Sequence, residues 1–81
     1  MKITLAEFLE LPAQEQLDIV LSIGYYIQAQ PGKERQEILY AVDMFFVELH
    51  FDHSAKRINQ IVAFDSGEVL NKYAEEIQGN L

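Results

Sequence analysis

The sequence contains no cysteine. This absence excludes a disulfide framework, a thiolate zinc site and a cysteine nucleophile, and it is typical of proteins in a reducing compartment. Long apolar runs are missing as well. The longest, Ile19 to Ile27, is interrupted by Ser22 and Gly24, and it falls far short of the ~20 residues that cross a bilayer. We therefore expect a cytoplasmic protein with no membrane partner.

Basic residues are scarce. The chain has six lysine and arginine residues against 13 aspartate and glutamate residues, which gives a formal net charge of −7 at pH 7. An acidic surface repels nucleic acid and anionic lipid, and no cluster of lysine and arginine reverses this effect locally. We therefore predict no nucleic-acid partner.

Catalytic and cofactor motifs are also missing. No serine lies in a nucleophile-elbow context, and no glycine belongs to a phosphate-binding run. We therefore predict no catalytic residue and no cofactor. A chain of 81 residues, of which 49% are hydrophobic, fits one compact domain over residues 1–81.

Two short helices are predicted near the N-terminus. Thr4 and Glu7 have the Ser/Thr-x-x-Glu spacing of a capping box, which predicts a helix over residues 4–11. Pro12 disfavours helical geometry at Leu11 and suits the first position of a second helix, which we expect to end near Asp18.

Residues 34–51 allow two interpretations. Apolar residues at three- and four-residue spacing would fit one amphipathic helix. In the alternative, Asp43-Met44 forms a two-residue hairpin loop that places Val42 opposite Phe45. Loops at residues 31–34 and 53–56 then close two further hairpins, and apolar side chains of all four strands fall on one face, with Gln60 as the exception. That face would contain Ile23, Tyr25, Ile27, Ala29, Ile38, Tyr40, Val42, Phe45, Val47, Leu49, Phe51, Ile58, Val62 and Phe64. This shared face favours the strands.

A last helix is predicted after the strands. Asp65 can cap it with Glu68 three residues on. Its apolar stripe would consist of Val69, Leu70, Tyr73 and Ile77. The predicted fold class is therefore α+β: two short N-terminal helices, a four-stranded antiparallel meander and a C-terminal helix, with the helices on one sheet face.

A short pattern in the predicted strands carries a resemblance. Leu-Tyr-x-Val-x-x-Phe-Phe-Val-Glu-Leu-x-Phe, at residues 39–51, is preceded by Gly24-x-x-Ile27 and followed by Ile58-x-x-Ile61-x-x-Phe64. It resembles a group of short bacterial proteins with no established activity, over roughly residues 17–77. Members of that group tend to have arginine at the position of Gln30 and tyrosine at that of Phe46. The resemblance supports the strands and implies no functional residues.

The leading function hypothesis is a protein-interaction module. In the predicted register, several apolar side chains project from the sheet away from the helices, and such patches commonly mark interaction sites. The predicted interaction residues are Tyr26, Leu39, Ala41, Phe46, Ile61 and Ala63. The partner would be a second copy of the chain or another protein.

Two alternatives remain. The first is a small metal-binding protein or metal-dependent enzyme. Glu48, His50 and Asp52 share one face of a strand, and His53 follows in the turn. Carboxylate and imidazole groups bind zinc, manganese or iron, although polar residues are equally expected on the solvated face of a strand. We therefore assign no metal ligand among them. The acidic charge also suits an antitoxin or immunity-type inhibitor that neutralises a basic partner.

Overall fold

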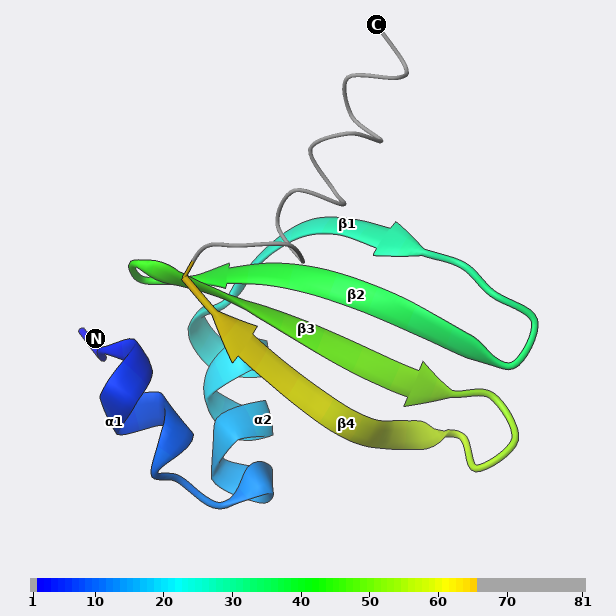
Figure 1. The fold of residues 1–81 in the computed structure, drawn as a ribbon, viewed down its shortest axis with the longest axis horizontal. Coiled ribbons are helices and arrows are strands. Elements are labelled where there is room, and N and C mark those ends of the chain that lie inside the picture. Colours follow the sequence, from blue (N-terminus) through cyan, green and yellow to red (C-terminus); the bar gives the residue numbers. More distant parts are fainter. Residues whose placement is uncertain (1, 66–81) are drawn as a thin grey trace, which may run out of the picture.

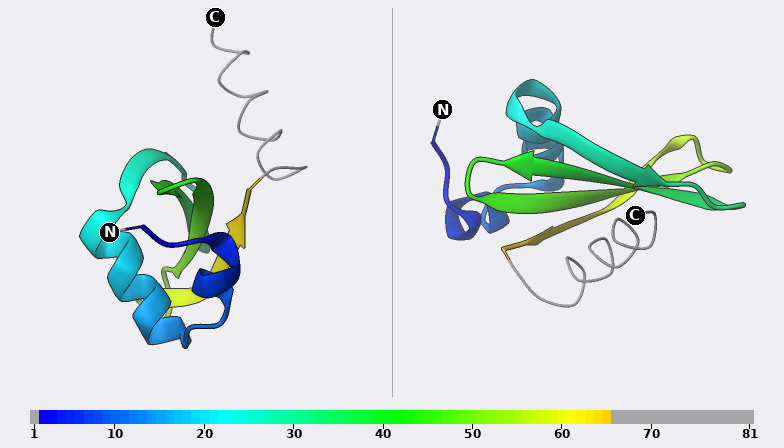
Figure 2. Two further views of the ribbon diagram at one scale, coloured as in Figure 1. Left: turned by 90° about the vertical axis from the view of Figure 1, so that its left-hand side faces the viewer. Right: turned by 90° about the horizontal axis from the view of Figure 1, so that it is seen from above.

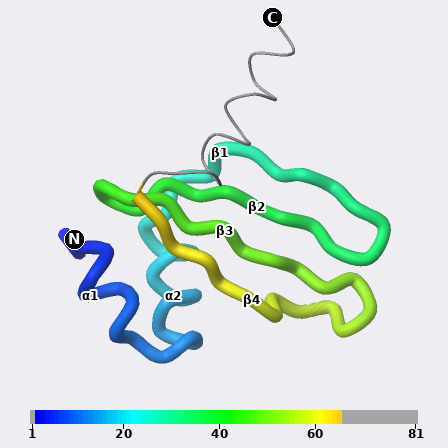
Figure 3. The backbone as a smooth tube through the Cα atoms, viewed as in Figure 1, coloured from blue at the N-terminus to red at the C-terminus, as the bar shows by residue number. Residues whose placement is uncertain are grey.

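The computed structural model describes residues 2–65 and has an α+β architecture (Figure 1). The elements are α1 (Leu5–Leu9), α2 (Ala13–Ile23), β1 (Tyr25–Gln30), β2 (Arg35–Val42), β3 (Phe45–Asp52) and β4 (Arg57–Phe64). The strands form one antiparallel sheet in the order β1-β2-β3-β4 (Figure 3). The predicted meander is confirmed. The predicted C-terminal helix lies outside the described residues.

Helix α1 begins at the predicted capping box. The Thr4 hydroxyl accepts a hydrogen bond from the Glu7 backbone N–H at 3.1 Å, and Glu7 Oε1 accepts one from the Thr4 backbone N–H at 2.9 Å. These two bonds satisfy N–H groups that have no partner within the helix. Hydrogen bonding of the Glu7 carboxyl to the Thr4 backbone N–H, and secondly to the Thr4 side chain, holds the pKa of this carboxyl below its usual range.

Helix α2 continues to Ile23, beyond the end predicted near Asp18. Its β-branched residues include Val20, which is fully buried in the core, so tertiary packing overrides their strand preference. The helix ends at Gly24, where a Cβ atom would lie only 2.3 Å from the Val20 carbonyl oxygen. Ile23 therefore belongs to the helix and not to the predicted strand face.

The β2–β3 hairpin has the predicted register, with Val42 opposite Phe45. A continuous helix over residues 34–51 is therefore excluded. In the two-residue loop, Asp43 has a φ of 51°, the left-handed conformation that aspartate tolerates better than most residues. The chemistry of this loop sets the register of the central strands.

Strand β1 contains a β-bulge that the predicted register lacks. Tyr26 lies opposite Tyr40 while Gln28 lies opposite Leu39, so Ile27 is an extra residue. On the N-terminal side of the bulge, the two faces are therefore exchanged relative to the predicted register. Tyr26 shares the helix-side face with Tyr40, and Tyr25 is on the outer face. The predicted inward position of Tyr25 and outward position of Tyr26 are therefore wrong.

A second bulge lies in β4. Phe51 is opposite Ile58 and His50 is opposite Gln60, so Asn59 is the extra residue. Ile61 and Ala63 consequently turn toward the helices, where they pack against the core. The bulge also explains why Gln60 was the exception in the predicted face. Val62 and Phe64, expected inside, lie on the outer face instead.

The hydrophobic core lies between the helices and one sheet face, and both helices cover that face (Figure 2). At its centre the rings of Phe8 and Phe45 are 5.2 Å apart, tilted by 56°. Its buried members are Ile3, Phe8, Val20, Val42, Phe45, Val47 and Leu49.

Candidate functional site

The outer sheet face holds only half of the predicted interaction residues. Leu39, Ala41 and Phe46 lie on it, whereas Tyr26, Ile61 and Ala63 lie on the helix side. Phe64 joins the face instead, with its ring stacked on Phe46 at 5.9 Å. The misfit of Gln60 was the sequence signal that could have located Phe64 on this face, because a bulge beside it reverses the rest of β4.

The centre of the outer face is closed to solvent. Leu39 is 1% exposed and Glu48, directly opposite it on β3, is 4% exposed. Leu39 is not a member of the core cluster on the helix side. An interaction surface must be accessible, so the outer face is a weaker candidate than the sequence alone indicated.

A cluster of ionisable groups lies next to Leu39. His50 Nε2 is 2.6 Å from Glu48 Oε1, and Glu37 joins them, with one ligand atom of each residue within 4.8 Å of the others. In the cross-strand register Glu37 is opposite His50. This register was available from the sequence, yet the predicted metal group did not include Glu37.

The other two predicted metal candidates have different roles. Asp52 Oδ1 accepts hydrogen bonds from the backbone N–H groups of Ser54 and Ala55, at 2.8 and 3.2 Å, and so shapes the β3–β4 turn. His53 packs edge-on to Phe51, with ring centroids 5.6 Å apart. The structure therefore brings Glu48 and His50 together but does not gather all four candidates.

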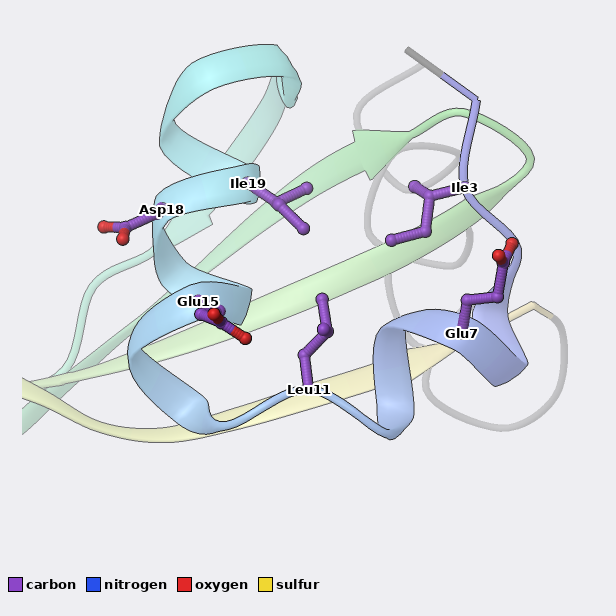
Figure 4. A pocket seen from close by; sticks show the side chains of 6 residues that line it. All are labelled: Ile3, Glu7, Leu11, Glu15, Asp18 and Ile19. Carbon is purple, nitrogen blue, oxygen red and sulfur yellow. The ribbon is translucent and has the colours of Figure 1, made fainter.

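A groove of about 420 Å³ lies between α1 and α2 (Figure 4). The apolar side chains of Ile3, Leu11 and Ile19 point toward one another in its middle. Three exposed carboxylates belong to its lining: Glu7, Glu15 and Asp18. Its six lining residues are therefore three apolar side chains and three carboxylates.

The charge around the groove has one sign. We call residues 3–23 the helix layer; they contain four acidic residues, Glu7, Glu10, Glu15 and Asp18, and no lysine, arginine or histidine. The layer also exposes apolar side chains: Leu9 is 58% exposed and Leu21 is 62% exposed. The helix layer therefore combines negative charge with exposed leucine side chains.

Sequence reasoning missed this groove. Its acidic residues were visible, but they are spread over two helices whose arrangement the hydrophobic pattern does not define. Within residues 2–65, no helix has the length and apolar character needed to span a membrane. Comparisons of the chain with protein-family models, curated protein sequences and solved structures found no match.

Proposed function

We propose that the protein is a cytoplasmic interaction module whose helix layer binds a basic, amphipathic segment of another protein. The observation that carries this proposal is the α1–α2 groove, in which an apolar floor is combined with three carboxylates and no basic residue. A partner segment with an apolar side chain between lysines or arginines would match both features. An acidic antitoxin or immunity-type inhibitor of a basic protein is one form that such a module takes.

The carboxylates and the apolar floor of the groove contribute differently to binding. Glu7, Glu15 and Asp18 are exposed, and an exposed ion pair contributes only ~0–1 kcal/mol. Their combined field accelerates encounter with a cationic partner and disfavours acidic ones. The apolar floor provides the affinity, because burying one leucine-sized side chain contributes ~1.5–3 kcal/mol. Binding should therefore weaken with added salt without being lost.

The test uses a defined probe. A synthetic amphipathic helix of lysine and leucine is titrated into the labelled protein, and amide chemical shifts are followed by NMR. We expect the largest shifts around Ile3, Leu11 and Ile19, and no comparable shifts with a glutamate–leucine peptide of the same length. Shifts spread evenly over the sheet, or equal binding of both peptides, would contradict the proposal.

A matched pair of variants distinguishes the effect of a charge in the groove from the effect of the net charge of the protein. Asp18→Lys reverses a charge in the groove, and Glu34→Lys makes the same change in the loop between β1 and β2, at the end of the sheet away from both helices (Figure 1). We expect Asp18→Lys to weaken binding of the lysine peptide at least about threefold, the value of a modest surface ion pair. An equal loss in Glu34→Lys would show that net charge alone is responsible.

A second candidate function is binding of a divalent metal by Glu37, Glu48 and His50. It is favoured by the proximity of one ligand atom from each residue, all within 4.8 Å. Zinc and manganese accept such mixed carboxylate and imidazole ligands. Equilibrium dialysis with Zn²⁺ should give one bound ion per chain that His50→Gln abolishes and His53→Gln retains. Equal binding to both variants would exclude this site.

A further inference from the structure

The corner between α2 and β1 exposes a local group of apolar side chains. Within residues 2–65, six large apolar side chains are exposed, and four of them lie among the six consecutive residues 21–26 at this corner. We call these four the corner patch: Leu21, Ile23, Tyr25 and Tyr26. Single exposed apolar residues are ordinary on a protein surface, but a local group of large ones commonly marks an interaction site.

The corner holds the patch in a fixed position. The Gly24 backbone N–H donates a hydrogen bond to the Val20 carbonyl oxygen at 2.9 Å, which ties the end of α2 to the start of β1. The Tyr26 ring packs edge-on against Tyr40, with ring centroids 6.0 Å apart. Tyr25 projects from the opposite face of β1, an end strand of the sheet, so the two exposed rings flank one sheet edge (Figure 1). Tyrosine rings held in this way supply contact area at a low entropic cost.

Charge distinguishes this segment from the rest of the chain. Residues 19–32 form the longest stretch of the sequence without a charged side chain, in a protein whose formal net charge is −7. The stretch begins in α2, contains the whole corner patch and continues through β1. A basic segment of the kind proposed for the groove finds no carboxylate among residues 19–32. The corner patch therefore suits a partner surface that is apolar and uncharged.

We propose that the corner patch binds the corner patch of a second copy of the chain, in a contact with two-fold symmetry. Such a contact places each residue near the same segment of the other copy, so a charged residue within it would meet its own sign. An uncharged apolar segment avoids this repulsion and lets two acidic chains approach each other closely. The proposal is independent of the groove, since none of the four patch residues lines it.

The exposed area fits a modest interface. An aromatic side chain buries ~150–250 Å², so Tyr25 at 76% exposure and Tyr26 at 55% exposure offer roughly 200–330 Å² per copy. The smallest specific interfaces bury about 1,200 Å² in total, or about 600 Å² from each partner. The two tyrosines thus supply about one third to one half of this minimum, and Leu21 and Ile23 add to it. We expect a dimer in reversible exchange with the monomer.

Salt separates this association from binding in the groove. Two chains of the same negative charge repel each other, and salt screens this repulsion while the burial of apolar area remains favourable. Dimerisation should therefore strengthen as the ionic strength rises from about 0.01 M to about 0.15 M, whereas binding of a lysine peptide in the groove should weaken. A dimer that weakens over this range would be held by ion pairs and would contradict the proposal.

The first experiment measures self-association of the full chain by sedimentation equilibrium, from about 1 µM to about 1 mM. Tyr25→Glu places a charge in the patch of both copies and should raise the dissociation constant of the wild-type dimer at least about tenfold. Met44→Glu makes the same change at an exposed apolar residue in the β2–β3 loop and should raise it far less. A wild type that stays monomeric, or equal effects of the two variants, would overturn the proposal.

The second experiment tests whether the two patches meet each other. Tyr25→Lys should also weaken association, because the added lysines of two copies repel each other. An equimolar mixture of Tyr25→Lys and Tyr25→Glu should form heterodimers more tightly than either variant forms homodimers. Tyr25 is mostly exposed, so both variants should keep the circular dichroism spectrum of the wild type. A mixture that associates no better than the separate variants would show that the patch meets a different surface, which would overturn the proposal.

Discussion

Asp43 Oδ2 accepts a hydrogen bond from the backbone N–H of Ile3 at 3.2 Å, which joins the N-terminal segment to the β2–β3 hairpin 40 residues away. The same aspartate holds the left-handed position of the hairpin loop. One side chain therefore fixes the register of the central strands and also positions the segment that leads into α1.

This double role gives the first prediction. Asp43→Ala removes the acceptor for Ile3 and places alanine at positive φ, so we expect a loss of about 1–2 kcal/mol in the free energy of unfolding. Asp43→Asn keeps an acceptor oxygen and a residue that tolerates this φ, and it should lose less than half as much. Urea denaturation of both variants measures the difference; equal losses would contradict the assignment.

Gly24 allows a close approach between the end of α2 and the start of β1. A Cβ atom there would lie 2.3 Å from the Val20 carbonyl oxygen and 3.2 Å from the Tyr40 ring. Relief of this clash must shift backbone, so Gly24→Ala should destabilise the protein by about 1–3 kcal/mol. Ser22→Ala, at an exposed position in the last turn of α2, is the control and should change the midpoint of thermal unfolding little.

The capping box of α1 makes stability depend on pH. Hydrogen bonds from Thr4 hold the pKa of Glu7 below its usual value of 4.5, so the folded state favours the carboxylate. This contribution is fully present above the unfolded pKa and is lost as the pH falls through the folded pKa. We expect Glu7→Ala to destabilise the protein at neutral pH, with a difference from wild type that shrinks below about pH 4.

Ser22→Ala provides the control for this pH dependence. The Ser22 side chain is exposed in the last turn of α2 and carries no group that titrates in this range. The difference between wild type and Ser22→Ala should therefore stay constant over the same pH range. A difference for Glu7→Ala that grew toward acid pH would contradict a lowered pKa for Glu7 in the folded state.

The bulge in β4 predicts an unusual tolerance to deletion. Removing Asn59 leaves Ile58, Gln60 and Ile61 in regular alternation, with each side chain still on its present face. We expect this deletion to keep stability within about 1 kcal/mol of wild type. Deleting Val62 instead would turn Ala63 and Phe64 to the opposite faces and should abolish cooperative unfolding in circular dichroism.

Local sequence signals predicted the helix start and the central hairpin well. They predicted less well which sheet face the side chains of the edge strands β1 and β4 occupy. The Thr4–Glu7 spacing and the Asp43-Met44 loop located a helix start and a hairpin because their chemistry acts within a few residues. The bulges at Ile27 and Asn59 reversed parts of β1 and β4, since one inserted residue inverts all later positions while leaving the composition unchanged.

For the candidate sites too, the features that depend on neighbouring residues were predictable and those that depend on tertiary structure were not. The pairing of Glu48 with His50 was predictable from alternation along one strand. The groove was not, because it depends on how Ile3 before α1, Leu11 in the α1–α2 connection and Ile19 on α2 approach one another. Such tertiary proximity has no periodic signature in the sequence.

The meander order of the sheet has a consequence for how the chain folds. Every strand pairs only with its neighbour in the chain, so each pairing closes a loop of a few residues at a small entropic cost. Such low contact order is typical of rapid folding. We therefore expect the β2–β3 hairpin to form early. The bond between Ile3 and Asp43 joins residues that are 40 positions apart, and it should form only when the sheet already exists.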